Sequence, residues 1–187
     1  MAHDQTRTIE LQLAKPSKES TELERLRQIA EATPTQSTEM AYLNAFPATF
    51  QRFKFTFYGE SGVGELYDKH QDHLMLLEKL SKKYPAKVLS IWLSAATYGE
   101  WDADAIGILQ HQLANYAAYN TKKFAEAILS KPLEQRLSII KFLADVENHS
   151  AYEEYKRTVE NLKVLGLKEL SKQFLRAKEE REKQQDH

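Results

Sequence analysis

Apolar residues recur every three or four positions along most of the chain, which is the spacing of an amphipathic helix. The faces that repeat most plainly are Leu74, Leu77 and Leu80; Ile106, Leu109, Leu113 and Tyr116; and Leu133, Leu137, Ile140 and Leu143. No apolar heptad persists for long enough to predict a long coiled coil. The pattern therefore predicts an all-α fold: a single domain of about eight to ten short helices, arranged as an orthogonal bundle or a short solenoid-like stack.

Signals at the helix ends divide this pattern into separate helices. Capping boxes at Thr21–Glu24 and Thr33–Gln36 predict the starts of the first two. Pro85 predicts a break followed by a new helix, because the residue before a proline avoids the helical conformation. Gly99 and Gly166 are predicted to end helices, since glycine readily adopts the left-handed conformation of a C-terminal cap.

The two ends of the chain differ from its middle. Thr8–Leu13 alternates polar and apolar residues, and the last residues carry mixed charge without an apolar face. We therefore expect an N-terminal extended segment over residues 1–20, a single helical domain over 21–183 and a frayed tail over 184–187.

One segment between the predicted helices fits two structures. Phe46, Phe50, Phe53 and Phe57 are spaced four, three and four apart, as on one helical face. Phe53, Phe55 and Phe57 also alternate, which suits a strand that could pair with Ile9–Leu13. We favour the helix, because Pro47 is well placed at the start of one.

Charge and composition exclude some functions. The chain has 187 residues, with 26 basic and 27 acidic side chains, so it lacks the basic excess typical of proteins that bind nucleic acid. It has no cysteine, which removes disulfides, thiolate metal sites and cysteine nucleophiles. No stretch is apolar for long enough to predict a membrane span. The first residues lack the apolar region of a signal peptide, so a cytoplasmic protein and a periplasmic one whose leader was removed are both left open.

A glycine-bearing loop, GESGVGEL, resembles the phosphate-binding loop of nucleotide hydrolases. Gly59 and Gly64 have the spacing of that motif, but Glu65 stands where it needs lysine and Leu66 where it needs a hydroxyl. A carboxylate would repel the phosphates, and leucine cannot bind magnesium. We therefore interpret the segment as a turn between helices and expect no nucleotide and no other cofactor.

His70 and His73 are the only candidate metal ligands with suitable spacing. They lie three positions apart on one predicted helical face, close to Asp72. Two imidazoles at that spacing can share a zinc ion, but a site needs a third ligand and usually a fourth. We expect no metal and interpret the pair as the solvated start of a helix.

Three carboxylates gather beside a tryptophan at Glu100, Trp101, Asp102 and Asp104. The simplest interpretation is local, with Asp102 as the helix cap and Asp104 in the first helical turn, where negative charge favours the helix dipole. The alternative is a binding surface for a partner protein, joined by Phe55 and Tyr58 if these aromatic side chains are exposed. Catalysis would require burial to separate the pKa values of two carboxylates.

Two runs, FPATFQRFKFTFYG with GELYD and YGEWDADAIGILQ, resemble a set of small bacterial helical proteins. The resemblance extends over Tyr42–Leu113, and some proteins of this kind are immunity proteins that accompany secreted toxins. It implies a shared structural or binding corner at Glu100, Trp101, Asp102 and Asp104 and carries no catalytic motif. We therefore expect a non-enzymatic protein-binding protein, of the immunity type, whose acidic corner meets a basic toxin.

Two other functions are alternatives to this one. The first is a metal-dependent hydrolase that uses His70 and His73 with distant carboxylates. The second is an architectural helical domain within a larger assembly. The oligomeric state is left open by the sequence.

Overall fold

The computed structural model describes residues 16–58, 64–145 and 149–185. These ranges contain ten α-helices, one 3-10 helix and no strand, so the predicted all-α fold is confirmed. The helices are α1 (Lys18–Ala32), α2 (Gln36–Ala45), α3 (Phe50–Phe57), the 3-10 helix η1 (Tyr67–Lys69), α4 (His70–Ser81), α5 (Pro85–Ala96), α6 (Asp104–Tyr119), α7 (Thr121–Leu129), α8 (Leu133–Ala144), α9 (His149–Val164) and α10 (Lys168–Gln185).

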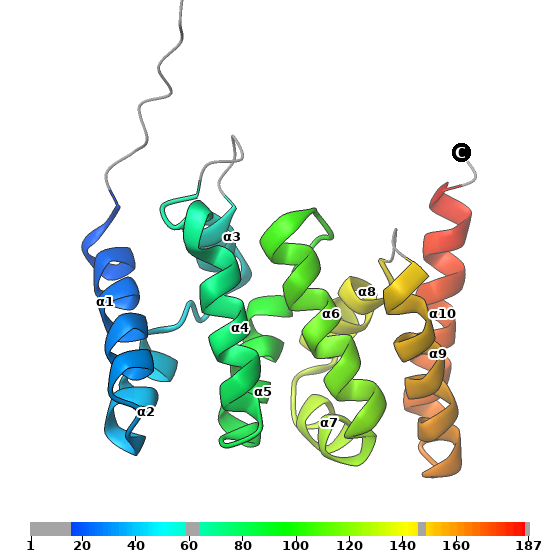
Figure 1. Ribbon diagram of the computed structural model, residues 1–187. Coiled ribbons are helices and arrows are strands. Elements are labelled where there is room, and N and C mark those ends of the chain that lie inside the picture. Colours follow the sequence, from blue (N-terminus) through cyan, green and yellow to red (C-terminus); the bar gives the residue numbers. More distant parts are fainter. Residues whose placement is uncertain (1–15, 59–63, 146–148, 186–187) are drawn as a thin grey trace, which may run out of the picture.

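The helices stand side by side in a row that follows the chain order, from α1 and α2 at one end to α9 and α10 at the other (Figure 1). α1 packs on α2, α4 on α5, and α10 on both α8 and α9. The largest packing surface joins α6 to α9 across the middle of the second half. Of the two arrangements that the sequence left open, the row corresponds to the solenoid-like stack.

The observed helix ends agree in part with those predicted from the sequence. Pro85 begins α5, and Gly166 adopts φ 75° after α9, as predicted. α1, however, begins earlier than predicted, because the Ser17 hydroxyl accepts from the Ser20 amide and caps the helix in place of Thr21. α2 begins later, because its capping box is formed by Thr35 and Thr38.

The ambiguous aromatic segment is helical. α3 begins at Phe50, after an N-cap at Thr49, so Pro47 lies in the preceding loop and does not start the helix. Phe53 and Phe57 are fully buried on one face. Phe55, between them, lies on the opposite face with 53% of its surface exposed. A strand would have placed Phe55 on the same face as Phe53 and Phe57, so its exposure opposite them follows from the helix.

The core is continuous along the row. Its largest fully buried side chains come from α2, α3, α5, α7, α8 and α10 and include Tyr42, Phe53, Trp92, Phe124, Phe142 and Phe174. Trp92 meets Tyr116 edge to face at 5.7 Å, and Phe124 meets Phe174 at 6.2 Å. Truncating such a side chain to alanine costs about 3–5 kcal/mol of stability. The row is therefore held together by contacts between elements distant in sequence.

Several predicted segments lie outside the described residues. These are the alternating stretch 8–13 and residues 59–63 of the glycine-bearing loop. At the other end, α10 continues to Gln185, so helix extends into the range predicted as a frayed tail. Among the helices that the structure describes, none combines the length and the apolar character that crossing a membrane requires.

Candidate functional site

The structure brings part of the predicted corner together at the edge of the row that holds the N-terminal ends of α4 and α6 (Figure 1). The Tyr58 hydroxyl, just after α3, donates to Asp102 Oδ1 at 2.9 Å. The Tyr67 hydroxyl, in η1, donates to Asp104 Oδ2 at 2.8 Å. Two tyrosine hydroxyls from one side therefore hold the chain where it passes from α5 to α6. We call residues 98–104 the corner.

The corner has an unusual backbone at both ends. Tyr98 has φ 59° and Asp104 has φ 54°, the only non-glycine residues with positive φ in the described part of the chain. This corrects the prediction that Gly99 supplies the left-handed residue after α5. Gly99 has a different role, because a Cβ there would lie 2.9 Å from the Phe142 ring. The chain thus approaches α8 closely, and the left-handed turn falls on the residue before it.

Asp102 does not cap α6 in the manner predicted. The N-cap position is Ala103, and Asp102 Oδ1 accepts from the Ala103 amide at 2.8 Å as well as from Tyr58. Because Asp104 is left-handed, the chain turns sharply into the helix at this point. The carboxylates of Asp102 and Asp104 therefore bind tyrosines from outside their own helix, which is a tertiary role as well as a local one.

Trp101 anchors the corner to the far helices. Its amide donates to Asp145 Oδ2 at 3.2 Å, at the end of α8. Asp145 Oδ1 in turn lies 2.6 Å from Arg181 Nε of α10. The indole is half-buried, so its contribution to any exposed surface is partial.

Glu100 and two aromatic side chains face outward. Glu100 is exposed, Tyr98 has 55% of its surface exposed and Phe55 has 53%. The Arg52 guanidinium lies 5.3 Å from the centre of the Phe55 ring, and the Lys54 ammonium 5.7 Å from that of Tyr58. Such cation–π contacts hold exposed rings in place.

The hydrogen bonds move Tyr58 and Tyr67 further from ionisation than an ordinary tyrosine. Donation to Asp102 raises the pKa of Tyr58, and donation to Asp104 raises that of Tyr67. Both phenols therefore stay protonated at neutral pH and act as hydrogen-bond donors. This chemistry suits recognition and gives the corner no activated nucleophile.

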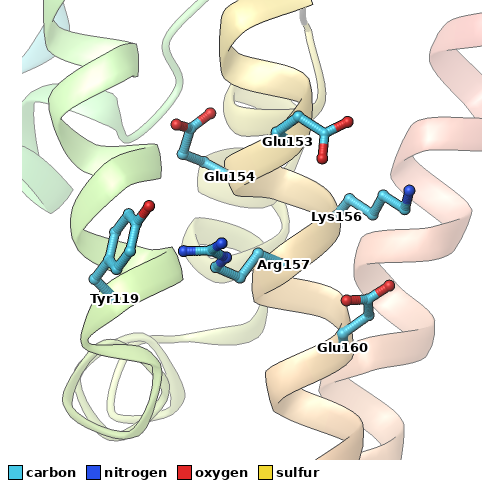
Figure 2. Close-up of a pocket in the computed structure, with 6 residues that line it drawn as sticks. All are labelled: Tyr119, Glu153, Glu154, Lys156, Arg157 and Glu160. Atoms are coloured by element: carbon cyan, nitrogen blue, oxygen red, sulfur yellow. The ribbon is translucent and has the colours of Figure 1, made fainter.

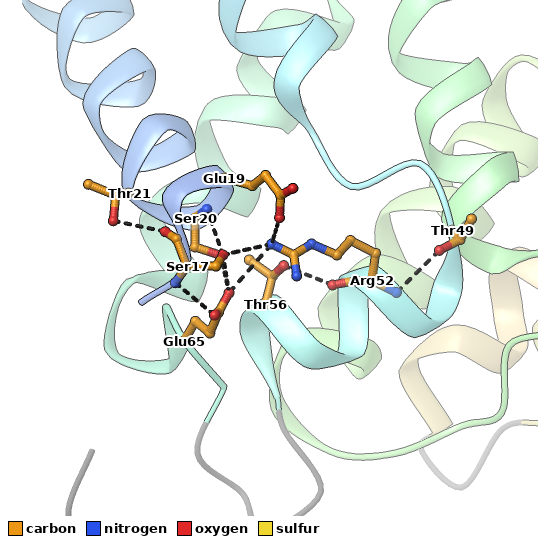
Figure 3. A network of polar contacts seen from close by, with 8 residues as sticks. All are labelled: Ser17, Glu19, Ser20, Thr21, Thr49, Arg52, Thr56 and Glu65. Atoms are coloured by element: carbon orange, nitrogen blue, oxygen red, sulfur yellow. Dashed lines mark hydrogen bonds and ion pairs between the residues drawn. The ribbon is translucent and has the colours of Figure 1, made fainter. Parts of the chain in front are cut away.

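A second polar cluster joins α1, α3 and the residues after the glycine-bearing loop (Figure 3). Glu65 accepts from the Ser17 amide and hydroxyl, each at 2.8 Å, and from the Ser20 hydroxyl. Arg52 Nη2 lies 3.5 Å from the same carboxylate and 2.9 Å from Glu19. Burial opposes the charged form of Glu65, but the serine bonds and Arg52 outweigh it and keep the pKa below its ordinary value.

Glu65 thus has a structural use where the phosphate-binding motif would need a lysine. A hollow of about 340 Å³ lies beside the cluster, lined by residues of α1, α3 and the α2–α3 loop that include Leu23, Phe46 and Arg52. The serine hydroxyls donate to the Glu65 carboxylate, whose lowered pKa makes it a weak base for activating them. The cluster has the chemistry of a clamp between helices, because the Ser17 amide, both serine hydroxyls and Arg52 Nη2 all meet an acceptor.

The two histidines have different surroundings. His73 is fully buried against Tyr42 and Phe57, with Nε2 3.0 Å from Glu24 Oε2 and Nδ1 3.2 Å from the Tyr42 hydroxyl. This corrects the expectation that both lie on a solvated helix start. His70 is half-buried and donates from Nδ1 to the Tyr67 carbonyl at 2.6 Å. Within residues 16–58, 64–145 and 149–185, no three His, Asp or Glu side chains are grouped so that they could hold a metal ion.

Two further hollows lie on the second half of the row. One, of about 200 Å³, is bordered by charged side chains of α9 together with Tyr119, over whose ring the Arg157 guanidinium lies at 4.7 Å (Figure 2). The other, of about 430 Å³, is an open groove between α5 and α7 with Leu89, Leu93 and Tyr116 at its base. Neither contains a grouping of side chains typical of catalysis.

Sequence reasoning missed the anchors of the candidate site. Tyr67 and Asp145 were not singled out, because each acts through a partner 37 or 44 residues away.

Comparison with protein-family models, with curated proteins and with solved structures found no match for this chain. These comparisons therefore provide no information about function.

Proposed function

We propose that this protein is a non-enzymatic protein-binding protein of the immunity type, which occludes a toxin that carries a basic surface. The observation that supports the proposal most is the anchored corner. Tyr58 and Tyr67 hold Asp102 and Asp104 from one side, Asp145 holds the Trp101 amide from the other, and Glu100 stays exposed between them. A surface fixed before binding loses little conformational entropy when a partner docks.

The backbone of the corner is consistent with a binding role. Non-glycine residues in the left-handed region cost about 1 kcal/mol or more each, and Tyr98 and Asp104 both adopt it. Such strain is retained where a segment must hold one shape, and binding surfaces are common places for it. The resemblance to helical immunity proteins points to the same class of function.

The chemistry of the exposed residues indicates the partner. Glu100, Tyr98 and Phe55 are all exposed, so a carboxylate and two aromatic rings are accessible to a partner. Aromatic side chains are enriched in the centres of protein interfaces, and rim carboxylates steer the approach of basic partners. We therefore propose lysine or arginine side chains of the partner opposite Glu100.

Charge reversal at Glu100 tests the proposal. We expect Glu100→Lys with Phe55→Ala to lower capture of the partner from the source cell's lysate and envelope fraction by roughly tenfold or more at low salt. The loss should shrink as salt rises, because screening weakens steering between exposed charges. Capture is measured by native pull-down with mass spectrometry, and affinity by titration of the recovered partner.

A control on another element keeps the result specific. Glu179→Lys makes the same charge change at an exposed position of α10 and should leave capture unchanged. Equal affinity of the double variant and the unmodified protein at every salt concentration would show that the corner is not the interface. A chain that elutes alone in all forms would contradict a binding role.

A further inference from the structure

The edge of the row opposite the corner carries three turns that share one composition. The α4–α5, α6–α7 and α9–α10 turns all lie along this edge (Figure 1). Each turn or the residues beside it carries two exposed lysines: Lys82 and Lys83, Lys122 and Lys123, and Lys163 and Lys168. We call these residues the lysine edge.

Within the described residues, most of the lysine edge forms no ion pair, although exposed glutamates such as Glu126 and Glu169 lie in the same helices. Lys83 pairs with Glu39, and none of the other five forms an ion pair with a described acidic side chain. The whole chain is nearly neutral, with a formal net charge of −1, so the positive edge is a local concentration. Its counterpart is the opposite edge, where Glu100, Asp102 and Asp104 gather.

Helix stability explains only half of these positions: Lys82, Lys83 and Lys163 lie at the C-terminal ends of α4 and α9, where the helix dipole favours positive charge, but the other three do not. Lys122 and Lys123 lie in the first turn of α7, and Lys168 begins α10. Positive charge at the N-terminal end of a helix opposes the helix dipole, so these side chains weaken their own helices slightly. A role outside the helix accounts for a charge that local structure disfavours.

The α9–α10 turn adds apolar side chains to the charge. Val164 has 85% of its surface exposed and Leu165 has 44%, between Lys163 and Lys168. The turn is held in one shape, since Gly166 has φ 75° and the Leu167 amide donates to the Leu162 carbonyl at 2.9 Å. An apolar tip flanked by cations is the composition that enters the interface of an anionic bilayer.

We propose that the lysine edge docks the protein on the surface of a membrane containing anionic lipids. The three turns lie in a line at one side of the row, so they can contact a flat surface together, whereas a single protein partner would need a long acidic face (Figure 1). Val164 and Leu165 enter the headgroup region, and the lysines contact lipid phosphates. The corner then faces away from the bilayer, which leaves it accessible to a partner.

Co-sedimentation of the full chain with vesicles tests this inference. We expect binding to phosphatidylcholine vesicles that contain about 30% phosphatidylglycerol, little binding to pure phosphatidylcholine, and loss of binding at high salt. Lys163→Gln with Lys168→Gln should lower the partition coefficient about thirtyfold, since each lysine near an anionic leaflet contributes about fivefold. Val164→Ser with Leu165→Ser should weaken binding at low salt, although it leaves every lysine in place.

Matched controls distinguish an effect of the lysine edge from an effect of positive charge elsewhere on the protein. Lys18→Gln with Lys69→Gln removes two exposed lysines from the opposite edge and should change binding far less. Circular dichroism confirms that each variant is folded. Absence of binding to anionic vesicles overturns the inference. An equal loss of vesicle binding in the control variant also overturns it. Capture of an acidic protein by the lysine edge without vesicle binding would overturn it too. Failure of the proposed function is a separate result, because Glu100→Lys leaves the lysine edge intact.

Discussion

At the scale of single residues, His73 shows how surroundings determine the chemistry of an imidazole. It reaches into the interior from α4 and meets Glu24 of α1, Tyr42 of α2 and Phe57 of α3. Burial lowers its pKa to about 4, and the neighbouring Glu24 carboxylate opposes that shift only in part. Arg27, next to Glu24, also disfavours a charged imidazole. His73 is therefore neutral in the folded protein at physiological pH.

A neutral buried histidine makes stability depend on pH. The unfolded chain binds a proton at His73 near the ordinary pKa of 6.5, but the folded chain does so only near 4. Acid therefore favours the unfolded state, and we expect the free energy of unfolding to fall by about 3 kcal/mol as the pH drops from 6.5 to 4. Urea unfolding at a series of pH values measures this slope.

Replacing the side chain isolates its contribution. His73→Gln should flatten the slope between pH 6.5 and 4.5, whereas His111→Gln, at an exposed position of α6, should leave it unchanged. Glu24, whose pKa is lowered to about 2 chiefly by its bond to Arg27, loses its stabilising effect only as the pH falls below 4.5. Equal slopes for the His73 variant and the unmodified protein would contradict the assignment.

At the scale of elements, the Glu65 clamp determines how α1 is attached. Glu65→Ala would leave the Ser17 amide and the buried Ser20 hydroxyl without their acceptor. Unpaired buried donors cost about 1–3 kcal/mol, so we expect a loss of about 2 kcal/mol and faster hydrogen exchange in the first turn of α1. Glu19→Ala removes an exposed partner of Arg52 and should change stability by less than about 0.5 kcal/mol. Similar losses in the two variants would show that Glu65 has no special role.

The sequence predicted elements well where a signal is local. Proline fixes its own backbone and glycine accepts a left-handed one, so Pro85 and Gly166 marked helix ends correctly. Serine and threonine are more frequent than helix N-caps, so a hydroxyl residue near a helix start need not be the one that caps it. The observed N-caps, Ser17 and Thr35, therefore lie a few residues from those predicted. The left-handed Tyr98 could not be predicted, because contact between Gly99 and Phe142 determines where that turn falls.

The candidate site was less predictable than the helices. Its residue types were visible at Glu100, Trp101 and Asp102, since carboxylates beside an aromatic stand out in any sequence. The partners were not visible, because Tyr58 meets Asp102 across 44 residues and Glu65 meets Ser17 across 48. Periodicity identifies a buried face but carries no information about which distant side chain lies opposite.

At the scale of the whole molecule, the arrangement in a row gives different helices different free energies of local opening. α6 packs on α4 and α5 at one side and on α9 at the other, whereas α1 and α2 have neighbours at one side only. Elements at the end of such a row open at lower free energy than those in the middle. We expect amides of α1 and α2 to exchange before those of α6 in native-state hydrogen exchange. Identical opening free energies in the three helices would show that the row unfolds as one unit.

The positions of the described chain ends have a practical consequence. α1 begins, and α10 finishes, at the edge that holds the corner (Figure 1). A support that holds the protein at the start of α1 or the end of α10 would cover the corner's edge and present the lysine edge to the analyte. Coupling through surface amines would tend to attach the lysine edge and turn the corner outward. Immobilisation chemistry alone therefore selects which face of this molecule an assay can detect.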